Sequence, residues 1–472
     1  MKINTNDPKG DINSPASEFI RETVRQNRRS GRGGTFAVCS AHPAVLDAAI
    51  HQSLADGSVL HVESTSNQVN QYGGYTGSTP AAFAAQIRRV AEQAGLPSAR
   101  VLLGSDHLGP YCWRSEAAAS AMAKACELAA QTVLAGYQKI HLDASMPCGG
   151  DPVLLPEEVV AERTVMLCQA AEQSYASMPA GSSRPTYVIG TEVPVPGGEV
   201  AEGECPKPTK LDDLLSSLDT FRKAFVARGL SAAWENVIAV VVQPGVEFGD
   251  STVFPYDPEK ARPLVTGLPD SPQLAYEAHS TDYQTPSSLA QMVKDHFAIL
   301  KVGPWLTFAY REAVFALDMI EREIAEFKKD ASHVREALES EMLRNPQHWN
   351  CYYRGSEEQQ KFARAYSLSD RCRYYWPQPN VEQAISRLMH NLDQPLPLAL
   401  LSQYLPVEYE AIRNAELENS APAIIRHHIQ SVLRVYAAAC ETLAGCCHSS
   451  QADPHHCQSP FERRRSFVSK SL

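Results

Sequence analysis

Eight short apolar runs divide the chain between residue 36 and about residue 308 into units of similar length. Each run has the length of a strand, several are rich in β-branched residues, and stretches with a helical spacing of apolar residues separate the runs. Apolar runs that alternate with helices predict parallel strands buried on both faces. The runs cover residues 36–43, 59–68, 101–110, 139–145, 186–194, 237–248, 275–285 and 297–308.

The number and length of these units predict an α/β fold, a (β/α)8 barrel. An open doubly wound sheet is the alternative, and it would carry a glycine fingerprint after its first strand. The first run reads FAVCSAHP and contains no such fingerprint, whereas polar residues close nearly every run. Barrel active sites draw on the carboxyl ends of many strands, so the pattern favours the barrel.

The alternation of strand-like runs and helices ends after residue 309. Several amphipathic helices are expected beyond it. Among them lies a segment rich in Tyr, Trp and Arg, at 348–379, whose composition suits an interface. We predict four parts: a lead-in (1–30), the barrel (31–310), a helical C-terminal extension (311–445) and a disordered tail (446–472).

Composition narrows the classes of function. The net charge of −11 argues against a nucleic-acid-binding surface. No apolar run approaches the roughly 20 residues that span a bilayer, and the first residues lack the apolar core of a secretory signal. The twelve cysteines show no repeated spacing, which indicates a reducing compartment, so we expect a cytoplasmic protein. A metal knuckle in the Cys- and His-rich tail is an alternative to disorder, but the tail lacks two CxxC-type pairs, so the sequence favours disorder.

Polar and charged residues at the ends of the runs would meet at one mouth of the barrel. His141 and Asp143 lie two residues apart, so they share one face of a strand. Acidic and imidazole groups in one site need a cation, and a divalent metal is the simplest one, with a metal-free hydrogen-bonded network as the alternative. The candidates are Glu63, Asn67, Gln68, Asp106, His107, His141, Asp143, Glu192, Gln243, His279, Ser280, Asp282, Lys301 and Gly303.

The residue types leave the metal open between zinc and manganese or magnesium. Two histidines and one carboxylate suit catalytic zinc, whereas a set with several carboxylates suits Mn²⁺ or Mg²⁺. A phosphorylated substrate is expected as well, because a glycine-rich loop (66–80) precedes a helix. Lys301 lies in the last run, after which barrels commonly hold phosphate.

Several long segments of the chain resemble one protein family. ESTSNQVNQYGGYTG, GSDHLGP, KIHLDAS, IGTEVPVPGGE, HSTDYQT, LKVGPWLTFAYREA and YSLSDRCRYYWP look like the tagatose-bisphosphate aldolase Z-subunit family, over about residues 15 to 430. The resemblance implies a barrel similar to class II aldolases, which are zinc-dependent and act on ketose phosphates. Some members of the family support an aldolase subunit without catalysis, and others are D-tagatose 6-phosphate 4-epimerases.

The resemblance also assigns residues. Asp106 and His107 match the Asp-His pair of class II aldolases, in which the His binds zinc and the Asp handles a proton at the cleaved carbon. His279 matches a second zinc histidine, whereas Gln243 stands where a third might be, and Glu192 is the candidate replacement. The implied metal ligands are therefore His107, Glu192, His279 and, more weakly, Gln243.

The chemistry of a 2-ketose phosphate narrows the reaction. Its carbonyl group acidifies only the protons on C1 and C3, so simple deprotonation does not invert C4. Oxidation would need a nicotinamide, and the sequence has no dinucleotide fingerprint. Retro-aldol cleavage between C3 and C4, rotation of the aldehyde fragment and re-addition remain. We therefore predict an isomerase, a metal-dependent epimerase that interconverts D-tagatose 6-phosphate and D-fructose 6-phosphate.

A non-catalytic stabilising subunit of a class II D-tagatose-1,6-bisphosphate aldolase is the alternative function. The predicted partners are a ketohexose phosphate and either further copies of this chain or an aldolase subunit. For the enzyme, we expect Asp106 and Asp143 to shuttle protons, with Glu63 as a further candidate. The residues expected to hold sugar hydroxyls and phosphate are Asn67, Gln68, Ser280, Lys301 and Gly303.

Overall fold

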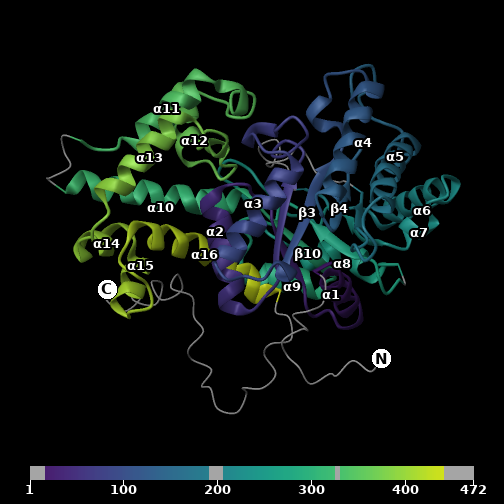
Figure 1. Ribbon diagram of the computed structural model, residues 1–472, viewed down its shortest axis with the longest axis horizontal. Coiled ribbons are helices and arrows are strands. Elements are labelled where there is room, and N and C mark those ends of the chain that lie inside the picture. The colour runs from purple at the N-terminus through teal and green to yellow at the C-terminus, as the bar shows by residue number, and fades with distance from the viewer. Residues whose placement is uncertain (1–15, 191–205, 270, 325–329, 441–472) are drawn as a thin grey trace, which may run out of the picture.

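The computed structural model describes residues 16–190, 206–269, 271–324 and 330–440. Its main sheet contains the strands β1 (Thr35–Val38), β2 (Leu60–Thr65), β3 (Val101–Leu108), β4 (Lys139–Leu142), β5 (Thr186–Ile189), β6 (Val237–Val241), β9 (Ala275–Ala278) and β10 (Phe297–Val302). All neighbours pair in parallel, and β1 pairs with both β2 and β10, so the sheet closes into an eight-stranded barrel (Figure 1). The predicted (β/α)8 barrel is confirmed.

The strands are apolar because both of their faces are covered. Every residue of β3 is buried, as expected when helices cover the outer face and side chains fill the interior. β2 and β3 pair in register from Leu60 with Val101 to Thr65 with Asp106. The polar residues that end neighbouring runs therefore lie at one edge of the barrel.

Helices follow the strands and cover the barrel. Several begin with Pro in the first turn, and Thr79 caps one of them by accepting a hydrogen bond from the N–H of Ala82. A short antiparallel pair, β7 (Glu247–Phe248) and β8 (Val253–Phe254), follows β6. The covering helices are α2 (Pro43–Asp56), α3 (Pro80–Gln93), α4 (Ala118–Leu134), α5 (Glu157–Ala176), α6 (Leu211–Ala227), α7 (Ser231–Trp234), α8 (Pro258–Thr266), α9 (Pro286–Lys294) and α10 (Pro304–Glu323).

The first described helix, α1 (Ala16–Ser30), closes the amino-terminal end of the barrel. Ile20 and Val24 are fully buried and pack with Leu102, Val188 and Ala298, which belong to the strands. The predicted lead-in to residue 30 therefore includes a helix that completes the barrel core, and apolar burial of this kind stabilises the fold.

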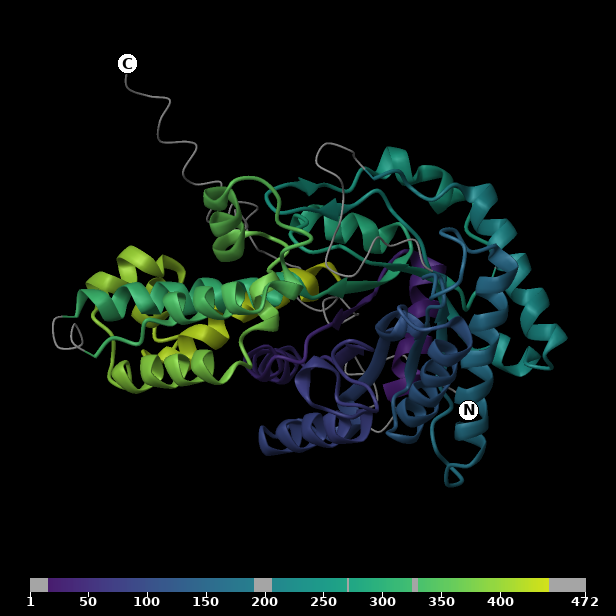
Figure 2. The ribbon, with the colours of Figure 1, turned by 90° about the horizontal axis from the view of Figure 1, so that it is seen from above.

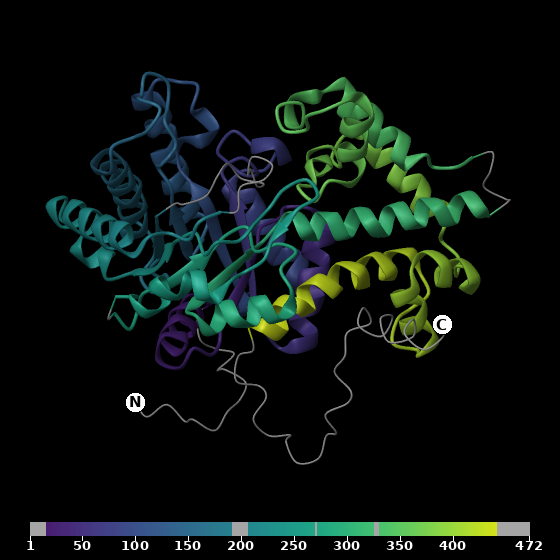
Figure 3. The ribbon, with the colours of Figure 1, turned by 180° about the vertical axis from the view of Figure 1, so that it is seen from behind.

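The C-terminal helices form a lobe at one side of the barrel (Figure 2). The long helix α10 extends into this lobe, and the last described helix returns beside it to pack on α2 and α9 (Figure 3). One buried apolar cluster includes residues of both parts, among them Leu300 and Leu433, so barrel and lobe share a core. The helices of the lobe are α11 (Val334–Arg344), α12 (Glu357–Tyr366), α13 (Pro379–Asn391), α14 (Leu398–Tyr404), α15 (Pro406–Arg413) and α16 (Ala421–Ala439).

Two expectations from composition concern the described residues. None of the helices in this part of the chain is long and apolar enough to cross a membrane. The cysteines of the described ranges, from Cys39 to Cys440, are free thiols. The predicted tail from residue 446 lies outside the described residues.

A buried carboxylate joins α15, α16 and α10. Glu408 Oε1 lies 3.1 Å from Nδ1 of both His427 and His428, and His428 Nε2 lies 3.4 Å from Glu312. Burial opposes ionisation of Glu408, but the hydrogen bonds from the two histidines outweigh it and lower its pKa to about 2. Burial likewise opposes protonation of His428, but its carboxylate partners raise its pKa to about 9.

We predict that Glu408→Gln lowers the free energy of unfolding by about 1–3 kcal/mol at pH 6, the cost of losing a hydrogen-bonded buried charge. The lowered pKa of Glu408 stabilises the fold above pH 4.5 and is lost as the pH falls towards 2. The raised pKa of His428 stabilises below pH 6.5 and is lost as the pH rises towards 9. Thermal unfolding across this range tests both signs. The control is the exposed Glu410→Gln on the same helix, and equal unfolding of the two variants would contradict the prediction.

Candidate active site

Charged side chains fill the barrel interior near the carboxyl ends of the strands. Lys139 Nζ lies 2.7 Å from Glu63 Oε1 and 2.6 Å from Glu277 Oε2, and all three side chains are fully buried. Lys301 Nζ also contacts Glu63 and lies 3.7 Å from Glu277 Oε1. Buried charges are tolerated only when they are paired, so β2, β4, β9 and β10 are joined by one ionic network.

Asp106 lies above this network, at the end of β3. Its Oδ1 is 3.0 Å from Lys301 Nζ and 3.2 Å from His141 Nδ1. The Nε2 atoms of His107 and His279 lie 3.8 Å and 4.0 Å from the same oxygen. Burial opposes the charge of Asp106, but the surrounding histidines outweigh it and hold the pKa of this carboxyl well below its usual range.

Three imidazole rings surround Asp106. The ring centres of His107, His141 and His279 lie 4.9 to 5.3 Å from one another. Each ring uses one nitrogen on an oxygen acceptor: His107 Nδ1 on Asp143, His141 Nε2 on the Gly190 carbonyl and His279 Nε2 on Glu277. Metal-binding histidines make such contacts, which fix the ring and, in His107 and His141, leave the nitrogen that faces Asp106 for an ion, whereas Nε2 of His279 faces both Glu277 and Asp106.

The contacts of His141 identify its tautomer. The Gly190 carbonyl only accepts, so His141 Nε2 carries the hydrogen, and Nδ1 accepts from the backbone N–H of His107 at 3.1 Å. The same Nδ1 lies 3.2 Å from Asp106 Oδ1. A cation held between Nδ1 and Oδ1, in place of the contact with the His107 N–H, would relieve the close approach of two acceptors, so the residues fit a metal.

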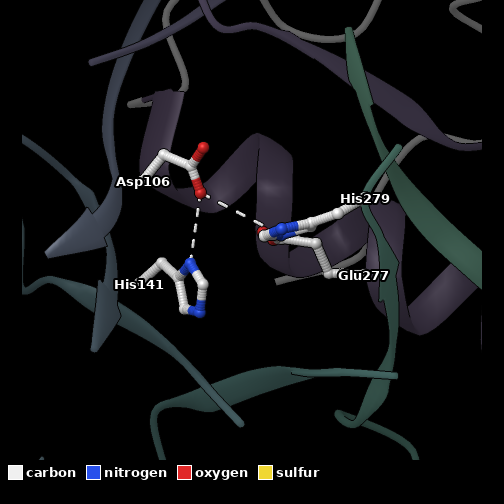
Figure 4. A group of neighbouring side chains, drawn as sticks. All are labelled: Asp106, His141, Glu277 and His279. Atoms are coloured by element: carbon white, nitrogen blue, oxygen red, sulfur yellow. Dashed lines mark hydrogen bonds and ion pairs between the residues drawn. The ribbon is translucent and has the colours of Figure 1, made fainter. Parts of the chain in front are cut away.

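Four of these residues form a compact donor set. One ligand atom each of Asp106, His141, Glu277 and His279 lies within 4.8 Å of the others (Figure 4). Two imidazole nitrogens and two carboxylates suit Zn²⁺ or Mn²⁺. The four carboxylates of Glu63, Asp106, Asp143 and Glu277 outnumber the two lysines, so the cluster keeps an excess of negative charge even when His107 is protonated, and this charge attracts a cation.

His107 is held in an unusual backbone conformation. Its φ is 44°, in the left-handed region, and Ser280 at the end of β9 has a φ of 52°. Its Nδ1 lies 2.7 Å from Asp143 Oδ2, which leaves Nε2 facing Asp106. Burial would lower the pKa of His107, but Asp106 and Asp143 raise it to about 9. Asp143 therefore orients His107.

A cavity of about 620 Å³ opens above this cluster. Its floor includes Asp106, His107, His279 and Lys301. One wall belongs to the C-terminal lobe, because side chains of the Tyr- and Arg-rich segment, predicted as an interface, line the same cavity. These are Arg373, Tyr374, Trp376 and Pro377.

The structure brings most of the predicted site residues together. Among the predicted ligands and proton carriers, Asp143 contacts His107, and Glu63 lies beneath the floor, bound by both lysines and by His61 at 2.8 Å. The predicted residues that line the cavity are Asn67, Gln68, Asp106, His107, His279, Ser280, Lys301 and Gly303.

One predicted ligand, Gln243, lies elsewhere, and another falls outside the described residues. Gln243 Oε1 accepts hydrogen bonds from the backbone N–H groups of Gly245 and Val246, so its amide stabilises the loop after β6 and is not part of the cavity lining. Glu192 lies outside the described residues.

Sequence reasoning gave no role to Lys139 or Glu277, and it placed His141 among the candidates without one. The sequence carries a weak signal for Glu277 and Lys139. Each lies two residues before a candidate histidine, Glu277 before His279 and Lys139 before His141, and residues two apart in a strand share a face. Arg373 carries no local signal, since its place on the cavity wall depends on how the lobe packs.

A solved structure resembles this chain over most of its length. The chain is 40% identical to a protein from Sinorhizobium meliloti 1021 described as a probable tagatose 6-phosphate kinase, with a TM-score of 0.79. The match covers 86% of this chain and 100% of the other. A fructose-bisphosphate aldolase from Campylobacter jejuni is 12% identical, with a TM-score of 0.40, over 84% of this chain and 94% of the other.

The sequence also matches a family as a whole. Residues 20–441, which include the barrel and the lobe, match the family described as D-tagatose-1,6-bisphosphate aldolase subunit GatZ/KbaZ-like. The chain therefore belongs to the GatZ/KbaZ-like family of D-tagatose-1,6-bisphosphate aldolase subunits.

Proposed function

We propose that the protein is a metal-dependent 4-epimerase that interconverts D-tagatose 6-phosphate and D-fructose 6-phosphate. The observation that carries the proposal is the placement of Asp106 among three histidines on the floor of one cavity. The cavity volume of about 620 Å³ suits a sugar phosphate. The family and the tagatose-related name of the Sinorhizobium meliloti protein support the substrate class.

The nitrogen donors that we propose for a divalent cation are His107, His141 and His279, with His141 in place of the third histidine that the sixth strand lacks. Such a cation supplies Lewis-acid stabilisation of the enediolate that forms when C3 and C4 separate. Zn²⁺ fits three imidazoles with an open position, and Mn²⁺ fits the same set with added carboxylates.

The chain's own residues handle the protons and hold the fragments. Asp106 removes the proton from the C4 hydroxyl as the C3–C4 bond breaks, and the surrounding histidines keep this carboxylate ionised. The three-carbon aldehyde rotates within the cavity and is attacked on its other face. Asp106 then returns the proton to the new C4 hydroxyl, while Asn67, Gln68 and Ser280 hold sugar hydroxyls from the cavity wall.

We predict that the purified protein, supplied with Zn²⁺ or Mn²⁺, converts fructose 6-phosphate into tagatose 6-phosphate. Asp106→Asn should lower kcat by about 10²- to 10⁴-fold, because a general base is lost. Chromatographic assay of the two ketose phosphates measures this, and Asp219→Asn on the exposed face of α6 is the control.

The family's description as an aldolase subunit favours one second candidate, a non-catalytic stabilising partner of a class II aldolase. Absence of turnover with any divalent metal, together with a longer half-life of an added D-tagatose-1,6-bisphosphate aldolase, would replace the epimerase by this function. Consumption of ATP with tagatose 6-phosphate would instead indicate a kinase.

We expect about one divalent metal ion per chain, and loss of most of it in His279→Ala and in His141→Ala, because each removes a nitrogen donor. Elemental analysis after dialysis measures the content directly. His51→Ala, on the outer face of α2, is the matched control and should keep its metal. Equal metal content in all these variants would contradict the ligand assignment.

Retro-aldol chemistry never breaks the C4–H bond. Fructose 6-phosphate deuterated at C4 should therefore give tagatose 6-phosphate that keeps its deuterium, with no primary isotope effect on kcat/KM. Mass spectrometry of the product and competitive rate measurements check both points. Loss of the label to solvent would indicate deprotonation at C4, and a primary isotope effect with retention would indicate transient oxidation.

A further inference from the structure

The start of α10, where barrels commonly hold phosphate, already holds an anion from the chain itself. Asp282 Oδ1 accepts hydrogen bonds from the backbone N–H groups of Gly303 at 3.0 Å and Trp305 at 2.8 Å. The Asp282 side chain is buried. A phosphate at this helix terminus would compete with that carboxylate for the same donors, so the substrate's phosphate needs another partner.

Lys301 is not that partner. Lys301 and Arg373 are the lysine and arginine side chains that line the cavity within the described residues. The ammonium group of Lys301 contacts Glu63 and lies 3.0 Å from Asp106, so its charge is neutralised beneath the floor. Arg373 is therefore the one remaining permanent cation of this lining.

Arg373 has no carboxylate within ion-pair distance among the residues that the structure describes. Its Nη1 donates to the backbone carbonyls of Ser369 at 2.5 Å and Asp370 at 3.1 Å, and its Nη2 donates to Tyr374 Oη at 3.1 Å. These bonds fix the guanidinium and use three of its five N–H donors. A positioned guanidinium that has no described carboxylate within ion-pair distance and keeps two N–H donors is suited to phosphate.

The opposite side of this end of the cavity carries the glycine-rich turn. The ring of Tyr374 lies 5.0 Å from that of Tyr75, edge to face, and Tyr75 and Thr76 line the cavity. Gly73 and Gly77 flank these residues with φ angles of 102° and 76°, which glycine adopts without strain. Arg373 and the turn that the sequence indicated for phosphate therefore lie at the same end of the cavity.

We propose that Arg373 binds the phosphate group of the ketose phosphate and so sets the preference for phosphorylated over unphosphorylated sugars. The inference rests on the proposed function for the identity of the sugar, and it adds that the C-terminal lobe supplies the specificity-determining residue. The reacting carbons would then lie at the barrel end of the cavity, over Asp106, with the phosphate end against the lobe.

Calorimetric titration of the full-length protein with fructose 6-phosphate and with fructose tests the proposal without requiring turnover. Arg373→Gln should weaken binding of fructose 6-phosphate by about 10- to 100-fold, the loss expected for a charge-assisted hydrogen-bonded pair, and leave fructose binding unchanged. Arg373→Lys should restore part of the affinity. Arg354→Gln removes the same charge from an exposed position of the lobe and should bind both sugars as the unchanged protein does.

Wild-type affinity for fructose 6-phosphate in Arg373→Gln would overturn the proposal, as would an equal loss for both sugars in a folded variant. Failure of the unchanged protein to bind fructose 6-phosphate would overturn it too. Tight binding that depends on Arg373, without epimerisation, would leave this inference standing and reject the proposed function alone. Circular dichroism of each variant establishes that it is folded.

Discussion

The arrangement of the site depends on the ion pairs between Lys139 and the two glutamates Glu63 and Glu277 inside the barrel. Removing one member of such a buried group costs about 3–5 kcal/mol, because the partner charge remains buried and unpaired. The same glutamates also position side chains that lie closer to the cavity. Glu277 holds His279, and Glu63 holds Lys301, which in turn contacts Asp106. The ion pairs that join the strands inside the closed barrel therefore also orient His279 and Asp106.

The parts of the fold that were predictable from the sequence are those with local causes. Apolar runs of strand length that alternate with helices indicate parallel strands, and the residues that end such runs lie at one mouth of the barrel. Asp106, His107 and His279 follow from this rule alone. By contrast, the contact of Lys139 with Glu277 joins opposite parts of the barrel, and its distance depends on strand tilt and stagger, which no local pattern encodes.

The third imidazole of the site likewise could not be identified from a local sequence pattern. The resemblance implies a third zinc histidine after the sixth strand. Gln243 stands there, and its amide stabilises a loop instead. His141 comes from β4, and its Nδ1 faces Asp106 because the backbone N–H of His107 binds it at 3.1 Å. His107 makes this contact in a left-handed conformation at the end of β3, which an Asp-His sequence does not predict.

The C-terminal lobe is part of the site because α10 belongs to both barrel and lobe. Buried Arg311 of α10 lies 3.0 Å from Asp370 Oδ1, and Thr307 donates to Asp370 Oδ2 at 2.6 Å. Asp370 directly precedes the turn that carries Arg373, so these contacts fix the cavity wall to the barrel's last helix. The same helix has Asp282 bound at its start. One helix therefore accounts both for the carboxylate that fills the phosphate position at its N-terminus and, through Asp370, for the cation that the lobe contributes to the cavity wall.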